Sequence, residues 1–164
     1  MRTETKHVAA WLQPEQIHLD VPLRDARHAL EFIADAIGTH RGLESGPIFR
    51  ALSRREEAGS TALGGGFALP HAKIAGIPHP LTLLVRARHP IDFKAPDRHA
   101  VTLLLAILVP HHGNPEDHLR LLALVAELFS QARFRALMDT GADPAAVAGS
   151  FRAGLAALRG THGA

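Results

Sequence analysis

The segment VTLLLAILV, residues 101–109, constrains the fold more than any other part of the chain. It carries no charge, and a proline follows at position 110. A helix that crosses a bilayer needs about 20 apolar residues, so this segment is too short to span a membrane. A short apolar run rich in branched side chains is typical of a strand that is buried on both faces. Such a strand needs a covering layer on each side of its sheet.

Further strands and helices alternate along the chain. The segments IHLDV (17–21) and LTLLVRA (81–87) have strand patterns, and FALPH (67–71) is typical of a short extended piece. Apolar residues at helical spacing, together with turn and cap residues, predict helices over 23–37, 45–59 and 115–129, a shorter helix after them, and a last helix from 143–144 to about 158.

Glycines and a serine set the expected boundaries of these elements. We expect Gly38 and Gly42 to end the first helix, since glycine readily adopts the conformation that follows many helices. Ser45 is the expected N-cap of the second helix, with Pro47 in its first turn. The glycine-rich segment GSTALGGG (59–66) is expected to be irregular.

These elements predict the α/β class. The chain has 164 residues, which suits one domain with a real hydrophobic core, and it shows no internal repeat and no linker. We therefore expect a single domain over residues 1–164, with a core over about 17–158. Its expected architecture is a mixed β-sheet flanked by helices on both sides.

Composition excludes several classes of protein. The formal net charge is only +2, and no dense Lys/Arg run is interleaved with aromatic residues, so nothing indicates nucleic-acid binding. The absence of cysteine rules out disulfides, thiolate metal sites and thiol nucleophiles. Residues 1–14 contain no apolar signal-peptide core, so we expect a cytoplasmic protein without membrane insertion.

The stretch GGGFALPHAK, residues 64–73, is the strongest candidate for a functional site. Pro70 fixes its own φ and biases Leu69 toward an extended conformation, which can hold the ring of His71 at a set angle. The glycines can present backbone N–H groups that bind an anion. A histidine that accepts phosphate needs this combination and open access for a partner. On the local pattern alone, a tight turn followed by a surface histidine is the preferred interpretation.

A longer segment carries a family resemblance. REEAGSTALGGGFALPHAK (55–73) resembles the active-site signature of enzyme IIA domains of the bacterial phosphotransferase system, mannitol/fructose type. HPIDFKAPDRHAVTLLLAILVP (89–110) resembles the strand–loop–strand segment of that family, and DHLRLLALVAELF (117–129) resembles its histidine-bearing helix. The resemblance covers roughly 17–158. Since no transporter segment is fused, the chain is most similar to the nitrogen-regulatory branch.

The resemblance implies a phosphoryl-transfer site built from three side chains. His71 stands where the family's histidine accepts a phosphoryl group from the phosphohistidine of the carrier protein HPr or its nitrogen-branch relative. Arg55 matches an arginine that pairs with the phosphoryl charge. His118 matches a second histidine, which opens a helix and can donate a hydrogen bond to the phosphoryl group.

The chain departs from the family pattern at two places. Gly64, Gly65 and Gly66 stand where the family often has GNG, so any contact of the asparagine side chain is lost. Arg120 stands where some nitrogen-branch members carry another histidine, so contacts with particular partners are expected to differ. We still expect the three glycines to form a phosphate-binding loop, and Phe67 to belong to a shallow apolar rim that docks the carrier.

Three functions stay open at this point. The nitrogen-regulatory resemblance implies a protein that signals by its phosphorylation state to targets such as a potassium transporter or a sensor kinase. A sugar-specific enzyme IIA, fructose/mannitol type, would use the same acceptor chemistry and pass phosphate to a IIB domain. A third possibility is a regulator that binds without phosphotransfer, against which the set Arg55, His71 and His118 argues. The partner, the sugar, the oligomeric state and the phosphorylated ring nitrogen are left open, as is whether the protein counts as an enzyme.

Rival chemistries have less support. His111 and His112 lie in a loop, and together with His71 and His118 they suggest zinc, because imidazoles are the only soft ligands of this chain. No HExxH motif supports that reading, no GxSxG motif indicates a serine hydrolase, and no GxxxxGK[ST] or GxGxxG motif indicates nucleotide binding. We therefore expect neither a metal nor a small cofactor.

Overall fold

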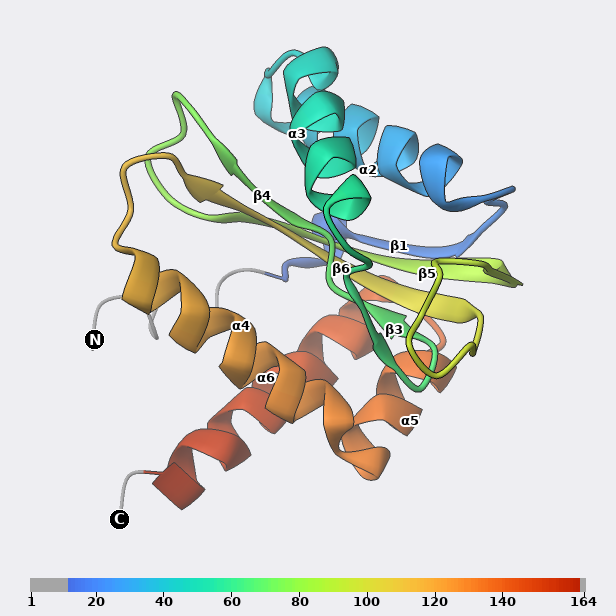
Figure 1. Ribbon diagram of the computed structural model, residues 1–164. Coiled ribbons are helices and arrows are strands. Elements are labelled where there is room, and N and C mark those ends of the chain that lie inside the picture. Colours follow the sequence, from blue (N-terminus) through green and yellow to red (C-terminus); the bar gives the residue numbers. More distant parts are fainter. Residues whose placement is uncertain (1–11, 163–164) are drawn as a thin grey trace. The chain divides into compact units, whose positions relative to one another are not determined.

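Figure 1 shows the computed structural model, which describes the backbone of residues 12–162. Side chains are described as far as Leu158. Contacts divide the chain into two compact units: one runs from His18 to Gly113, and the other combines the segment up to Ile17 with the segment from Asn114 onward. No helix in the described part is long and apolar enough to cross a bilayer. The single-domain boundary of 1–164 stays a prediction.

A six-stranded mixed sheet dominates the unit of residues 18–113. Its strand order is β1-β5-β6-β3-β2, and β4 also pairs with β6. The strands are β1 (Ile17–Val21), β2 (Ala62–Gly64), β3 (Phe67–Ala68), β4 (His71–Ile74), β5 (Leu81–Ile91) and β6 (Val101–Pro110). β6 runs antiparallel to β5 and parallel to β3 and β4, so the predicted mixed sheet is confirmed.

β6 is buried on both faces, as its apolar sequence predicts. Every residue of 103–108 is 0% exposed. On one face, Leu104, Ala106 and Leu108 belong to the main hydrophobic cluster. Leu103 and Leu105 alternate with them along the strand and therefore point to the opposite face.

Helices α2 (Ala26–Arg41) and α3 (Ser45–Glu57) cover the first of these faces (Figure 1). Both bury aliphatic side chains in the cluster that includes β6: Ile33, Ala34, Ile37, Ile48 and Leu52. α3 already begins at Ser45, so the prediction of Ser45 as its N-cap is wrong. Glu44 holds that position, and its side chain makes no capping bond.

Gly38 does not end α2, contrary to the prediction. The helix continues to Arg41, and Gly42 ends it in the left-handed conformation with φ of 68°. Gly38 serves close packing instead, because a Cβ there would lie 2.7 Å from the carbonyl oxygen of Leu43. The chain thus turns back over the last turn of α2, and the N–H of Leu43 donates to the Gly38 carbonyl at 2.9 Å.

The prediction that the segment 59–66 is irregular is wrong in part, because residues 62–64 form a strand and 65–66 a tight turn. β2 and β3 form an antiparallel hairpin in which Gly64 lies opposite Phe67. The two turn residues, Gly65 and Gly66, have φ of 64° and 77°, and positive φ at both positions is what a type I′ hairpin turn requires. The strands have only 3 and 2 residues, too few for an alternating pattern to show.

The other unit contains the predicted C-terminal helices. Its elements are the 3-10 turn η1 (Pro14–Gln16), α4 (Pro115–Ser130), α5 (Ala132–Thr140) and α6 (Pro144–His162). Rings join the helices: Phe129 meets Phe134 edge-on at 5.0 Å, and Phe134 lies 6.2 Å from Phe151. Gly154 leaves room for Phe134, since a Cβ there would come within 2.4 Å of that ring.

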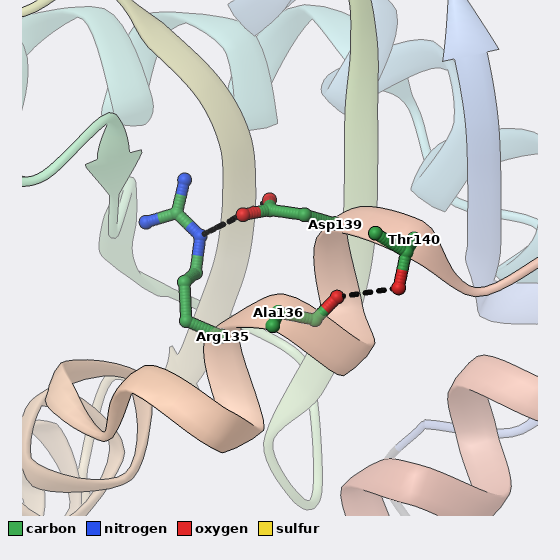
Figure 2. Close-up of polar contacts among 4 residues, drawn as sticks. All are labelled: Arg135, Ala136, Asp139 and Thr140. Carbon is green, nitrogen blue, oxygen red and sulfur yellow. Dashed lines mark hydrogen bonds and ion pairs between the residues drawn. The ribbon is translucent and has the colours of Figure 1, made fainter.

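Short-range bonds stabilise α5 (Figure 2). The Nε of Arg135 donates to the carboxylate of Asp139 at 3.1 Å, and the hydroxyl of Thr140 donates to the carbonyl of Ala136 at 2.7 Å. A nine-residue helix is too short to be stable by propensity alone, so burial of Phe134 and the i,i+4 contact of Arg135 with Asp139 add to its stability.

Candidate functional site

His71 opens β4, directly after a break in the edge that pairs with β6. β3 and β4 keep a common parallel register, with Phe67 opposite Leu103 and His71 opposite Ile107. Pro70 lies in the break, where it has no N–H to offer, and its carbonyl accepts from the N–H of Ile107 at 2.9 Å. The backbone on either side of the break is therefore fixed to the central strand.

Two hydrogen bonds orient the ring of His71. Its Nδ1 lies 2.8 Å from the carbonyl oxygen of Leu69, and a carbonyl can only accept, so Nδ1 carries the proton. The Nε–H of Arg55 donates to Nε2 at 3.3 Å, which requires a lone pair on Nε2. Both contacts agree on one neutral tautomer, with the proton on Nδ1 and the lone pair on Nε2.

The environment keeps this ring neutral. Burial is the main cause that lowers the pKa of His71 below its ordinary value of 6.5, and the guanidinium of Arg55 lowers it further. The hydrogen bond to Leu69 and the carboxylate of Glu56 act in the opposite direction, but the net shift is downward. A neutral imidazole is a nucleophile, so His71 has the protonation state that phosphoryl acceptance needs.

Arg55 lies in the last turn of α3 and is held at two points. Besides its contact with His71, its Nη1 donates to the carbonyl of Gly59 at 2.8 Å. The structure thus brings together Arg55 and His71, which the sequence places 16 positions apart. A guanidinium beside Nε2 is placed to pair with an anion bound to that nitrogen.

Glu56 holds the segment that follows α3. Its Oε1 accepts from the N–H of Thr61 at 3.1 Å, and its Oε2 accepts from the hydroxyl of Thr61 at 2.6 Å. The carbonyl of Thr61 in turn accepts from the N–H of Leu69 at 3.0 Å. The sequence does not signal these contacts, because an acidic residue in a run of charges resembles a solvated helix surface.

The three glycines span the end of β2 and the hairpin turn, and the contacts of Gly64 and Gly65 do not resemble a phosphate cradle. The N–H of Gly65 donates to Oδ2 of Asp97 at 2.8 Å, and a Cβ on Gly64 would lie 3.1 Å from that oxygen. In the register with β6, Phe67, the first residue after the turn, lies four residues before His71, about 13 Å along the sheet. The phosphate-binding role of Gly64, Gly65 and Gly66 stays a prediction that these contacts do not favour.

His118 lies in the first turn of α4, in the other compact unit. Asn114 caps that helix by accepting from the N–H of Glu116 at 2.9 Å. The hydrogen bond from His118 to a phosphoryl group stays a prediction. The expectation for Phe67 is wrong: its side chain is 3% exposed, packed where β3 meets β6, and cannot form a docking rim.

The described residues contain no group of three or more His, Asp or Glu side chains that could hold a metal ion. His111 and His112 are both exposed, and their rings meet edge-on at 5.2 Å. The zinc interpretation gains no support from the described residues.

The chain is similar to known proteins over most of its length. Residues 10–151 match the family described as "Phosphoenolpyruvate-dependent sugar phosphotransferase system, EIIA 2". A nitrogen regulatory protein of Pseudomonas aeruginosa is 34% identical over 125 residues, which are 76% of this chain and 80% of that protein. A fructose-specific EIIA component of the phosphotransferase system of Haloferax volcanii is 35% identical over 113 residues, 68% of this chain and 73% of its own length.

A solved structure shares the fold. The crystal structure of the nitrogen regulatory protein IIA-Ntr from Neisseria meningitidis superimposes with a TM-score of 0.81 at 31% identity, covering 91% of this chain and 99% of that one. The expected α/β fold of enzyme IIA type is therefore confirmed. The family match and these relatives span most of the sequence, and the chain belongs to the EIIA type 2 family of the phosphoenolpyruvate-dependent sugar phosphotransferase system.

Proposed function

We propose that this protein accepts a phosphoryl group on Nε2 of His71 from the phosphohistidine of an HPr-like carrier in the cytoplasm, and regulates target proteins by its phosphorylation state. The observation that carries the proposal is the neutral tautomer of His71, with its lone pair beside the guanidinium of Arg55. The similarity to nitrogen regulatory proteins favours the regulatory role. A potassium transporter or a sensor kinase is the kind of target that the family resemblance implies.

The transfer is an in-line displacement at phosphorus. The lone pair on Nε2 forms the new N–P bond while the N–P bond of the carrier breaks, and that electron pair stays on the carrier's ring nitrogen. Nδ1 of His71 keeps its proton throughout, so the phosphorylated ring becomes cationic, and the carbonyl of Leu69 stabilises that charge. Arg55 pairs with the phosphoryl oxygens, and His118 donates a further hydrogen bond to them.

The first test is intact-mass spectrometry after incubation with phosphoenolpyruvate, enzyme I and the carrier. Wild type, His71→Ala and His118→Ala are compared with His79→Ala, which changes an exposed histidine. We expect one acid-labile phosphoryl group that requires the carrier and is lost only in His71→Ala. An unmodified wild type with a competent carrier would refute phosphotransfer and leave a regulator that only binds its partners.

A sugar-specific role is the second candidate, which the similarity to a fructose-specific EIIA component favours. In that role the phosphorylated protein passes its phosphoryl group to a IIB domain. Incubation of the phosphoprotein with IIB domains separates the two roles, because only the sugar-specific role loses the phosphoryl group rapidly. The regulatory role instead predicts that the phosphoryl group, which itself carries about −2 charge, changes the affinity for a target.

A further inference from the structure

The geometry points to Glu56 as a positioning residue that fixes the reactive tautomer of His71 through Thr61 and Leu69. The inference rests on the proposed function of His71 and assigns to Glu56 a part in the same reaction. Glu56 acts on Nδ1 of His71 and not on the reacting Nε2. The contacts run from Glu56 to Thr61, from the Thr61 carbonyl to the Leu69 N–H, and from the Leu69 carbonyl to Nδ1.

The first step joins α3 to the segment after it. Both carboxylate oxygens of Glu56 accept from Thr61, at 3.1 Å from its N–H and 2.6 Å from its hydroxyl. Thr61 is 3% exposed, so water competes little for these bonds. Charge-assisted bonds to a buried residue are among the stronger hydrogen bonds in proteins, and they fix the position of the Thr61 peptide.

The second step joins Thr61 to Leu69. The Thr61 carbonyl accepts from the Leu69 N–H at 3.0 Å. The carbonyl of Pro70, which follows Leu69, accepts from the N–H of Ile107 at 2.9 Å. The Leu69–Pro70 peptide is thus held from both sides, and the φ of Pro70 is restricted by its ring. The Leu69 carbonyl then lies 2.8 Å from Nδ1 of His71 and holds the proton there.

The charge of Glu56 acts on the reaction in two opposite directions. Its carboxylate repels an approaching phosphoryl anion, but it also raises the pKa of His71 and so stabilises the cationic ring that phosphorylation creates. Positioning predicts slower acceptance, because a ring released by Leu69 places part of its proton on Nε2, and that form has no lone pair to attack with. The tautomer of the His71 ring, read together with the rate, therefore separates positioning from charge, because charge alone leaves the proton on Nδ1.

The experiment compares variants of two neighbouring glutamates in the full chain. Glu56 and Glu57 line the same cavity of about 370 Å³, but only Glu56 has a hydrogen bond to Thr61 among the described contacts. Glu57→Ala is therefore the matched control for Glu56→Ala. The readouts are the ¹⁵N chemical shifts of the His71 ring at about pH 8, where an ordinary histidine is neutral, and the rate of transfer from phosphorylated carrier.

We expect wild type and Glu57→Ala to show a protonated Nδ1 and an unprotonated Nε2. Glu56→Ala should show a mixture of tautomers and roughly tenfold slower transfer, by analogy with the lower end of the loss seen when a group that orients a metal-bound imidazole is removed. Glu56→Gln should lie between them, because its amide oxygen still accepts one bond from Thr61.

A Glu56→Ala protein with the wild-type tautomer, or with transfer as fast as in Glu57→Ala or faster, would overturn the inference. If Glu56→Ala does not fold by circular dichroism, Glu56→Gln is judged by the same two readouts. The tautomer is measured on the unphosphorylated protein, so it can be determined even if the wild type accepts no phosphoryl group. A wild type that accepts no phosphoryl group would refute the proposed function, but not the positioning of the ring by Glu56.

Discussion

Replacing Arg55 with alanine tests the electrostatic part of the site. The guanidinium donates from Nε at 3.3 Å to the nitrogen that would carry the phosphoryl group, and Gly59 holds its other end. Oxygens bound to phosphorus on Nε2 would then lie within about 4 Å of the positive charge. At that distance two unit charges attract by about 1 kcal/mol in water and by about 4 kcal/mol at an effective dielectric of 20.

Arg55 and His71 are both half-buried, so the effective attraction lies between these limits. A loss of about 1.5–3 kcal/mol of transition-state stabilisation corresponds to transfer slowed roughly 10- to 150-fold. Arg55→Lys should fall between wild type and Arg55→Ala, because it keeps the charge but loses the planar pair of donors.

The assay is a rapid-quench time course with saturating phosphorylated carrier. Saturation separates the transfer step from carrier binding. Arg54→Ala is the control, since it removes an exposed positive charge from the neighbouring position of the same helix. Equal rates for Arg55→Ala and Arg54→Ala would refute the assignment of Arg55 to the transferring group.

Four further predictions concern the pH dependence of transfer, the pH dependence of stability, the hairpin turn and the central strand. Because burial lowers the pKa of His71 below 6.5, transfer should be flat above that pH and fall as pH drops through the folded pKa; a rate that still rises well above pH 6.5 would contradict this. The unfolded chain binds this proton at about pH 6.5 and the folded chain only at lower pH, so the same group should lower the unfolding free energy as pH falls below 6.5. Gly65→Ala should lower the unfolding free energy measured in urea by about 1 kcal/mol, since the φ of Gly65 is 64°. The rate of transfer should stay unchanged, and a large loss of transfer would instead support a phosphate-binding role for this turn. Leu104→Ala removes a fully buried side chain and should cost about 2–5 kcal/mol, and a much smaller loss would contradict its place in the core.

Sequence pattern predicts two of the strands well. The predicted strand over 17–21 has the bounds of β1, and the run at 101–109 differs from β6 only by Pro110. Both segments are long enough for their apolar pattern to be read. β5 continues to Ile91, four residues beyond its predicted end. Sequence pattern does not show this extension, because Arg88, His89 and Pro90 are exposed and interrupt the apolar pattern.

Glycines mislead where their role is packing or turn geometry. Gly38 has the sequence context of a helix end, but the close approach of Leu43 is a tertiary contact that no local pattern shows. The hairpin of β2 and β3 is hidden for a related reason, since glycines occupy both its turn and the end of one strand.

The candidate site is predictable only in part. The family resemblance leads to His71 and Arg55, and the structure places their nitrogens in contact. Glu56 escapes notice, because its function depends on bonds to a hydroxyl and a backbone N–H five positions away. The ring tautomer depends on a main-chain oxygen, which every residue type supplies, so side-chain identity carries no trace of it.

The main-chain origin of that oxygen has a consequence for mutational surveys. An alanine scan at Leu69 removes a side chain that is 3% exposed and leaves the carbonyl in place, so it reports the position as a packing site. The contribution of the Leu69 main chain to the reaction can be measured only when the backbone itself is altered. An α-hydroxy acid introduced at position 69 by chemical ligation replaces its N–H with an ester oxygen and deletes the bond to Thr61 while the leucine side chain stays. Position 69 would then register as part of the reaction, although its side chain takes no part in it.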